Sequence, residues 1–228
     1  MVRGSSAKGN CTSSNLVPAS KISRGAMAAR LALIQEIVVQ THAGKRIFIY
    51  LHMKGILHIN NFVAEPDTLF SYLKDNVEWD ERMTARKTAS FGVAYNYSQM
   101  SYPYQPMPTS LRDICVEVHK TIGFEPNNCL VNYYLDGKSK MGFHADQTDI
   151  LQADTGIAIV SLGATRILRF RNIEDKSKIL DYELASGSLI YMSQVIQKDW
   201  EHAIPKSDTD KARMSLTLRK IVLNVNNV

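Results

Sequence analysis

Cysteine is scarce in this chain. Its 228 residues include Cys11, Cys115 and Cys129, with no pair at CxxC spacing. An odd, widely spaced set of this kind predicts neither a disulfide framework nor a metal site built from thiolates. It favours a reducing, intracellular location, whether cytoplasm, nucleus or an organelle, in which the thiols simply pack in the interior.

Long apolar runs are also missing. A membrane-spanning helix needs roughly 18 or more consecutive apolar residues, and the longest apolar segments here are interrupted by Lys, Arg or Asp. We therefore expect no association with a membrane. With 45% hydrophobic residues the chain can bury a sizeable core in one catalytic domain. Nothing in the sequence demands a partner subunit, so we expect a monomer.

Acidic residues are absent from residues 1–35, which carry five basic ones. The chain has 27 Lys and Arg against 22 Asp and Glu, so setting these five aside leaves 22 of each sign. The net charge therefore lies entirely in this segment. We assign residues 1–44 to a partly disordered N-terminal extension, which is a transit segment, a basic arm for polyanions or an unstructured tail. Residues 45–228 form the expected catalytic domain.

Apolar residues recur at helical spacing in three segments of the first half of the chain. These segments are residues 27–42, 66–77 and 110–122. Pro66 suits the first turn of the second helix. Ser110 with Asp113 resembles a capping box at the start of the third, and Gly123 supplies its end. The apolar faces of the second and third helices predict packing on a sheet.

Short β-rich runs, separated by Gly, Ser, Asn and Asp turns, follow residue 127. The expected strands cover residues 129–135, 156–162, 166–171, 179–184, 188–193 and 213–223. Helices followed by many short strands predict an α+β fold. The strands indicate an antiparallel barrel or a double-sheet jelly roll, with the helices packed on one of its sheets.

A His-x-Asp motif lies at His144 and Asp146. Residues two apart on an extended chain project to the same side, so both can reach one ion. A non-haem Fe(II) oxygenase needs two imidazoles and one carboxylate on one face, with open positions for co-substrate and dioxygen. His202 is the best candidate for the third ligand. Four histidines without a partner pattern are expected to be surface or core residues: His42, His52, His58 and His119.

Polar and apolar residues alternate without interruption from Arg213 to Arg219. On a strand, Arg213, Ser215, Thr217 and Arg219 face one way. One interpretation is a half-exposed edge strand with its polar side towards water. The other is a cradle for a dicarboxylate inside a barrel, in which Arg213 grips the far carboxylate and Ser215 supplies a hydroxyl. The nearby metal motif favours the cradle.

Together these motifs resemble the AlkB family of Fe(II)- and 2-oxoglutarate-dependent nucleic-acid oxygenases. The resemblance covers residues 88–221 and extends more loosely back to about residue 45, so residues 1–44 lie outside it. It rests on the order and spacing of Asn132-Tyr133-Tyr134, His144-Ala145-Asp146, His202 and the strand from Arg213 to Arg219.

The resemblance implies a double-stranded β-helix core and specific roles for the matching residues. Positions matching His144, Asp146 and His202 bind iron in the family, and the one matching Arg213 pairs with the distal carboxylate of 2-oxoglutarate. Three further matches complete the co-substrate site: Asn132, Tyr134 and Arg219. Ser215 departs from the Asn often found there, which puts co-substrate affinity in doubt more than co-substrate identity.

The resemblance also implies a reaction on nucleic acid. The expected activity is oxidative demethylation of N-alkylated bases, such as 1-methyladenine and 3-methylcytosine, in DNA or RNA, with release of succinate, CO2 and formaldehyde. A base inside a duplex must be flipped out or presented on a single strand to reach a buried iron, and stacking on flat side chains assists this.

Candidate substrate contacts each have a structural alternative. Tyr95 and Tyr97 are the preferred base contacts, although a tyrosine-rich segment is also typical of a packed surface loop. Arg86 and Arg169 could meet phosphates or be solvated surface charges. Asp149 could accept a hydrogen bond from an exocyclic amine or simply be a turn residue.

Two other functions stay open from sequence. The neutral composition of residues 36–228 leaves open an oxygenase that hydroxylates a nucleoside, a peptide or a small metabolite, because a dedicated duplex binder usually has a basic face. A catalytically silent binding module with the same fold is the third interpretation. It is disfavoured because all three candidate metal ligands are present.

Overall fold

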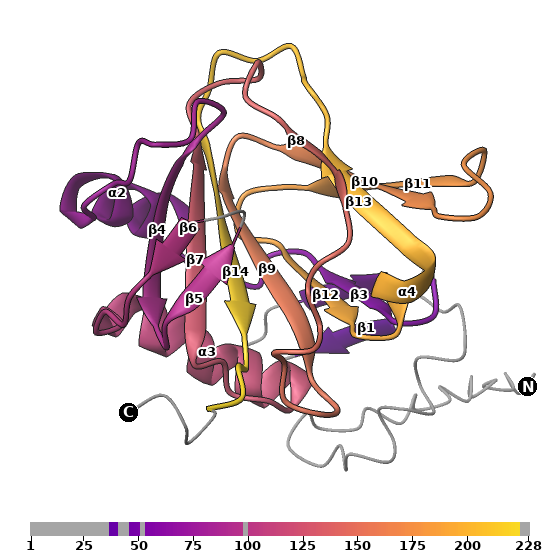
Figure 1. Ribbon diagram of the computed structural model, residues 1–228, viewed down its shortest axis with the longest axis horizontal. Helices are drawn as coiled ribbons and strands as arrows, with labels where there is room; N and C mark the ends of the chain where they lie inside the picture. Colours follow the sequence, from indigo (N-terminus) through magenta and orange to yellow (C-terminus); the bar gives the residue numbers. More distant parts are fainter. Residues whose placement is uncertain (1–36, 41–45, 51–52, 98–99, 224–228) are drawn as a thin grey trace, which may run out of the picture.

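The computed structural model describes residues 37–40, 46–50, 53–97 and 100–223. Two β-sheets face each other, and the two longer helices cover the outer face of the larger sheet (Figure 1). This arrangement confirms the α+β class and the jelly-roll core with helices packed on one sheet. Within the described ranges, no helix is long and apolar enough to cross a membrane.

The larger sheet is antiparallel throughout, and one of its interior strands carries the predicted cradle. Its strand order is β1-β2-β3-β12-β9-β14-β7-β4. The strands are β1 (Ile37–Gln40), β2 (Arg46–Tyr50), β3 (Ile56–Ile59), β4 (Lys87–Gly92), β7 (Asn128–Tyr134), β9 (Gly156–Gly163), β12 (Leu189–Ser193) and β14 (Arg213–Arg219). Because β14 lies between β7 and β9 and is buried along its length, the edge-strand interpretation is wrong.

The smaller sheet supplies the metal-binding strands. Its order is β11-β10-β13-β8, again antiparallel. The strands are β8 (Met141–His144), β10 (Arg166–Asn172), β11 (Ile179–Leu184) and β13 (Trp200–Ile204). A separate hairpin joins β5 (Tyr95–Tyr97) to β6 (Met100–Tyr102), and the short α4 (Ile196–Asp199) precedes β13.

Two hydrophobic layers hold these parts together. The first lies between the larger sheet and the helices α2 (Pro66–Asn76) and α3 (Thr109–Ile122), where Leu73 and Val118 are fully buried. The second lies between the two sheets, where Ile157 meets Leu168 and Phe170. Burying this apolar surface is the main driving force for the fold.

Alternation along β14 divides its side chains between these layers. Met214, Leu216 and Leu218 belong to the helix-facing core. Arg213 and Thr217, on the opposite side, face the space between the sheets, where Thr217 lines a cavity. The two-sided pattern predicted from the sequence is therefore confirmed, and both sides are buried.

Three local predictions are wrong. The helix expected over residues 27–42 is contradicted at Ile37–Gln40, which form β1 and pair with β2; residues 27–36 and 41–42 lie outside the described residues. Three consecutive β-branched residues favour this strand. The capping box fails as well, because α3 begins one residue before Ser110 and the cap position, Pro108, makes no side-chain hydrogen bond. The last strand ends at Arg219 instead of residue 223.

Other boundaries agree closely with the sequence analysis. The second helix begins at Pro66, and the third ends at Gly123, whose φ of +97° is the left-handed conformation that glycine adopts readily. His119 is exposed on α3, and His58 is buried edge-on to Tyr182, as expected of bystander histidines. His42 and His52 lie outside the described residues.

Candidate active site

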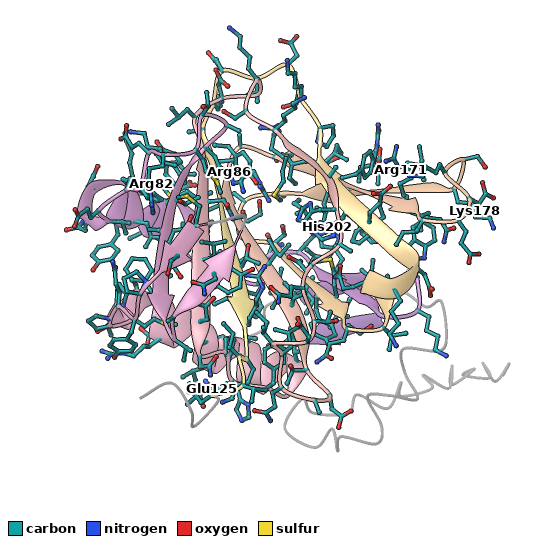
Figure 2. The ribbon with its side chains drawn as sticks, in the orientation of Figure 1. Arg82, Arg86, Glu125, Arg171, Lys178 and His202 are labelled. Atoms are coloured by element: carbon teal, nitrogen blue, oxygen red, sulfur yellow. The ribbon has the colours of Figure 1, made fainter. Side chains whose placement is uncertain are left out.

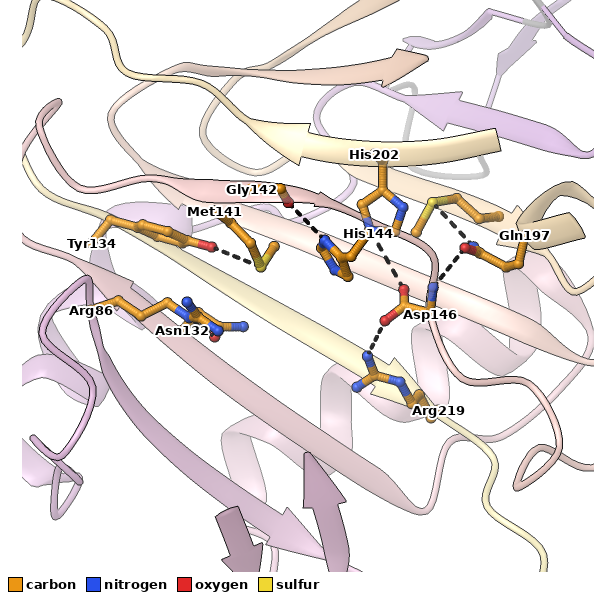
Figure 3. Close-up of polar contacts among 11 residues, drawn as sticks. Arg86, Asn132, Tyr134, Met141, Gly142, His144, Asp146, Gln197, His202 and Arg219 are labelled. Atoms are coloured by element: carbon orange, nitrogen blue, oxygen red, sulfur yellow. Dashed lines mark hydrogen bonds and ion pairs between the residues drawn. The ribbon is translucent and has the colours of Figure 1, made fainter. Parts of the chain in front are cut away.

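Three side chains from the smaller sheet converge on one point. His144 ends β8, Asp146 follows it by two residues, and His202 lies on β13 directly opposite His144 in the ladder. One ligand atom from each lies within 4.8 Å of the others, and the two imidazole rings are 4.4 Å apart between centroids. The spacing and the ladder register thus bring together the residues that the sequence motif predicted (Figure 3).

The donor set fits a divalent iron. Two imidazoles and one carboxylate on a single face are the ligands of non-haem Fe(II) oxygenases. Nδ1 of His144 lies 3.0 Å from the Gly142 carbonyl oxygen, and a proton held there leaves Nε2 available for the ion. Burial lowers the pKa of His202 to about 4, so its imidazole is neutral at physiological pH and able to ligate.

Asp146 is held from two sides. Its carboxylate accepts a hydrogen bond from Nη2 of Arg219 at 3.0 Å, and its backbone amide donates to Oε1 of Gln197 at 2.9 Å. Burial alone would raise the pKa of this carboxyl group. The positive charge of Arg219 and the imidazole groups of His202 and His144 outweigh that effect and lower the pKa below its usual value. The carboxylate is therefore ionised and oriented before an ion arrives.

A second cluster lies further along β14. Arg213 is 1% exposed, donates from Nε to Oγ of Ser161 at 3.0 Å, and has its guanidinium 5.4 Å from the centre of the Tyr134 ring. Burial lowers its pKa to about 10, which still leaves it protonated at neutral pH. Its Nη1 atom has no hydrogen-bond partner among the described residues. A buried cation with an unused donor fits the distal carboxylate of 2-oxoglutarate.

Other predicted co-substrate residues lie on the same pair of strands as Arg213. Tyr134 is opposite Arg213, and Asn132 is opposite Ser215, on the paired strands β7 and β14. All four are buried. The cavity between the sheets is lined by Arg86, Leu130, Asn132, Met141, His144, Asp146, Ile159, His202, Thr217 and Arg219. One cavity thus contains the metal ligands together with Asn132 and Arg219.

Comparison with known proteins decides the family. The profile of the 2OG-Fe(II) oxygenase superfamily matches residues 58–219, and human DNA oxidative demethylase ALKBH2 is 31% identical over 183 residues, covering 70% of each chain. The protein belongs to the AlkB family of this superfamily. It is accordingly an Fe(II)- and 2-oxoglutarate-dependent dioxygenase.

Further relatives agree with this assignment. Mouse ALKBH2 is 31% identical over 186 residues, covering 70% of this chain and 76% of that protein. Alpha-ketoglutarate-dependent dioxygenase alkB homolog 3 of rat is 29% identical over 180 residues, with 70% and 61% covered. The chain spans 66% of the length of bovine ALKBH2. The solved structure of OsALKBH1 matches the fold with a TM-score of 0.55 at 15% identity, covering 73% of this chain and 96% of that one.

An open groove gives access to the metal site of this AlkB-family dioxygenase. It runs beside the inner cavity and is lined by residues 83–86 and 140–144, so that Arg86, Met141 and His144 border both spaces. Arg86 is buried, and its Nε donates to Oδ1 of Asn132 at 2.6 Å. The structure therefore places Arg86 at the boundary between groove and cavity.

The remaining substrate candidates of the AlkB-family enzyme lie apart from one another. Tyr95 is buried with its ring 4.8 Å from the Arg219 guanidinium, whereas Asp149 is exposed in a turn. Arg169 forms an ion pair with Asp181 on the outer side of the smaller sheet. The side chain of Tyr97 lies outside what the structure describes. Figure 2 shows how far the outer part of that sheet, marked by Lys178, lies from His202.

Sequence reasoning missed four residues that complete the site. Ser161 accepts a hydrogen bond from Arg213, and Gln197 accepts one from the backbone amide of Asp146. Arg166 donates to three backbone carbonyl groups in the loops before β8 and β14. Met141 lines the cavity. The alternation within residues 156–163 could have indicated an inward-facing Ser161, but a single Gln or Met carries no sequence signal for such a role.

Proposed function

We propose that the protein oxidatively demethylates N-alkylated bases, such as 1-methyladenine and 3-methylcytosine, in DNA or RNA. The observation that carries this proposal is the open groove ending at His144, because it lets one base of a long polymer approach a metal site that is otherwise enclosed. The relatives named DNA oxidative demethylase support the same substrate class.

Iron and 2-oxoglutarate, when bound, would supply the oxidation: O2 and the oxo-acid would give succinate and CO2, and a C–H bond of the N-methyl group would become C–OH, with later release of formaldehyde. The protein supplies positions and charges. Arg213 binds the distal carboxylate of the co-substrate, and Arg219 keeps Asp146 ionised and oriented. All three of these side chains are buried, and the lower dielectric constant of the interior strengthens their charge interactions.

The groove is suited to a substrate with phosphate groups. Its rim carries Lys140, and Arg86 lies at its inner end. Exposed cations elsewhere on the smaller sheet are paired with acids, as in Arg169 with Asp181 and Arg171 with Glu201. Because few unpaired charges are left on that sheet to track a long duplex, we expect the enzyme to bind a short stretch of single-stranded nucleic acid around the target base.

The decisive experiment measures succinate and formaldehyde together. The protein is incubated with Fe(II), 2-oxoglutarate and single-stranded oligonucleotides containing 1-methyladenine or 3-methylcytosine, and the same oligonucleotides without methylation are the control. Equal amounts of both products, only with methylated strands, are expected. Succinate without formaldehyde on every strand would contradict the proposal and favour a nucleoside, peptide or small metabolite as substrate.

The neutral composition of residues 36–228 is the observation behind that alternative. The two functions differ in salt dependence. A nucleic-acid substrate held by phosphate contacts loses affinity as salt rises, because binding releases counterions. A metabolite held inside the cavity would bind with little dependence on salt. Measuring KM for the methylated strand at two salt concentrations distinguishes them.

A further inference from the structure

Met141 lines the cavity that contains the three metal ligands, but it is not itself one of the ligands. Met141 is on β8, three residues before His144, and borders both the inner cavity and the open groove. Its Sδ is 3.9 Å from the hydroxyl group of Tyr134, a predicted co-substrate residue (Figure 3). Met141 therefore borders both the cavity that contains the metal ligands and the open groove, and its sulfur contacts a predicted co-substrate residue.

Two other methionines near the site provide a comparison. Met192 is fully buried, its Sδ accepts a hydrogen bond from Nε2 of Gln197 at 3.7 Å, and it packs between the sheets without lining the cavity. Met83 lines the open groove but not the inner cavity. Of these three methionines, only Met141 lines the cavity that contains all three metal ligands, whereas Met83 shares only the groove with His144.

We propose that Met141 is a self-oxidation site, converted to methionine sulfoxide when the enzyme turns over 2-oxoglutarate without a nucleic-acid substrate. A thioether is a soft, polarisable nucleophile that is readily oxidised. One oxygen atom of O2 is transferred to Sδ, which gives up two electrons and forms the S=O bond. The other oxygen atom enters the new carboxylate of succinate as CO2 leaves. The inference rests on the dioxygenase activity alone and not on the identity of the substrate.

Oxidation of Met141 has a consequence for the site. A sulfoxide oxygen is a much stronger hydrogen-bond acceptor than a thioether sulfur, and it makes a flexible apolar side chain polar. The hydroxyl group of Tyr134, already 3.9 Å from the sulfur, then donates to the sulfoxide and is less available to the co-substrate. Idle turnover would therefore slow the enzyme, and reduction by a methionine sulfoxide reductase would restore it.

The test is peptide mass spectrometry after idle turnover. The protein is incubated with Fe(II), 2-oxoglutarate, catalase and isotopically heavy dioxygen, without nucleic acid, and succinate is measured in the same samples. We expect the Met141 peptide to gain one heavy oxygen atom, about tenfold more often than the Met83 or Met192 peptides, because oxidation follows proximity to the oxidant. Catalase removes peroxide, which would oxidise Met83 and Met141 alike, because both side chains are half-buried.

Matched controls make the result specific. Omitting 2-oxoglutarate or using His144→Ala should leave Met141 unmodified, and Met141→Leu should remove the modified peptide. The variant Met83→Leu should leave oxidation of Met141 as in the wild type. Succinate formation without heavy oxygen at Met141 would overturn the inference while leaving the dioxygenase intact. Equal labelling of Met83 and Met141, or no labelling and no succinate, would overturn it too.

Discussion

Arg219 donates a hydrogen bond of 3.0 Å to Asp146, although 73 positions separate them in the chain. Both side chains are nearly inaccessible to solvent, with 3% and 5% exposed. The pair links β14 of the larger sheet to the segment that follows β8 of the smaller sheet. Leaving either charge unpaired in the protein interior would cost free energy. The pair therefore contributes to the stability of the fold and also keeps Asp146 ionised for metal binding.

Removing the cation should destabilise the metal-free protein. Arg219→Met leaves the buried carboxylate of Asp146 without its main cationic partner, and we expect a loss of about 3–5 kcal/mol in the free energy of unfolding. Urea unfolding measures this. Added Mn(II) should restore part of the loss, because the ion supplies the missing positive charge. Arg169→Met removes an exposed ion pair and is the control, with an expected loss below about 1 kcal/mol.

Replacing a metal ligand should abolish turnover without unfolding the protein. His144→Ala removes one of the two imidazoles from a partly exposed position at the end of β8. We expect no succinate release above background, together with an unchanged circular dichroism spectrum. His119→Ala, on the exposed side of α3, should retain normal turnover. Near-normal activity of the His144 variant would refute the ligand assignment.

Replacing Arg213 should weaken co-substrate binding strongly but change the stability of the metal-free protein little. In Arg213→Met the charged hydrogen bonds to 2-oxoglutarate disappear, and we expect its KM to rise roughly 10- to 100-fold. The metal-free protein should not lose stability comparably, because the guanidinium is buried with one unused donor and its removal relieves that cost. Succinate release against 2-oxoglutarate concentration, with urea unfolding, measures both. An unchanged KM would contradict the assigned role.

The sequence predicted that His144, Asp146 and His202 converge, because its signal is local. His144 and Asp146 are two residues apart, and the alternation from Arg213 to Arg219 needs only a strand period. His202 was proposed as the third ligand because the site needs a second imidazole, and the strand ladder pairs it directly with His144. These parts of the site could be predicted because covalent spacing and backbone geometry alone bring the side chains together.

The parts that failed depend on tertiary pairing. Leu31, Ile34 and Val38 recur at helical spacing, but pairing with β2 makes residues 37–40 a strand. Ser161 and Gln197 acquire their roles only when distant strands place them beside Arg213 and Asp146. The solvated-charge alternative for Arg86 is wrong, because the fold buries this side chain against Asn132, 46 positions away. Such long-range contacts leave no pattern in a single sequence.

Arg166 should contribute more to the free energy of unfolding than most single side chains. It is 1% exposed at the start of β10 and donates to the carbonyl oxygens of Asp136, Ser139 and Pro205 at 3.1, 2.8 and 2.6 Å. These carbonyls belong to the two loops that lead into β8 and β14. Arg166→Met leaves three carbonyl groups without a donor, at about 1 kcal/mol or more each, so we expect a loss of about 3 kcal/mol in urea unfolding. Arg166→Lys should recover part of it.

The two described cysteines should resist modification in the folded protein. Burial raises the pKa of Cys115 to about 12 and that of Cys129 well above its usual value, so at pH 8 both are neutral thiols and lack the reactive thiolate. In a Cys11→Ser variant, we expect almost no reaction with a disulfide reagent at pH 8 until denaturant is added, when both should react at once. Raising the pH to 9 should change the native rate little, because a raised pKa keeps the thiols protonated there. Rapid reaction of one thiol in the native protein would show that its surroundings open to solvent.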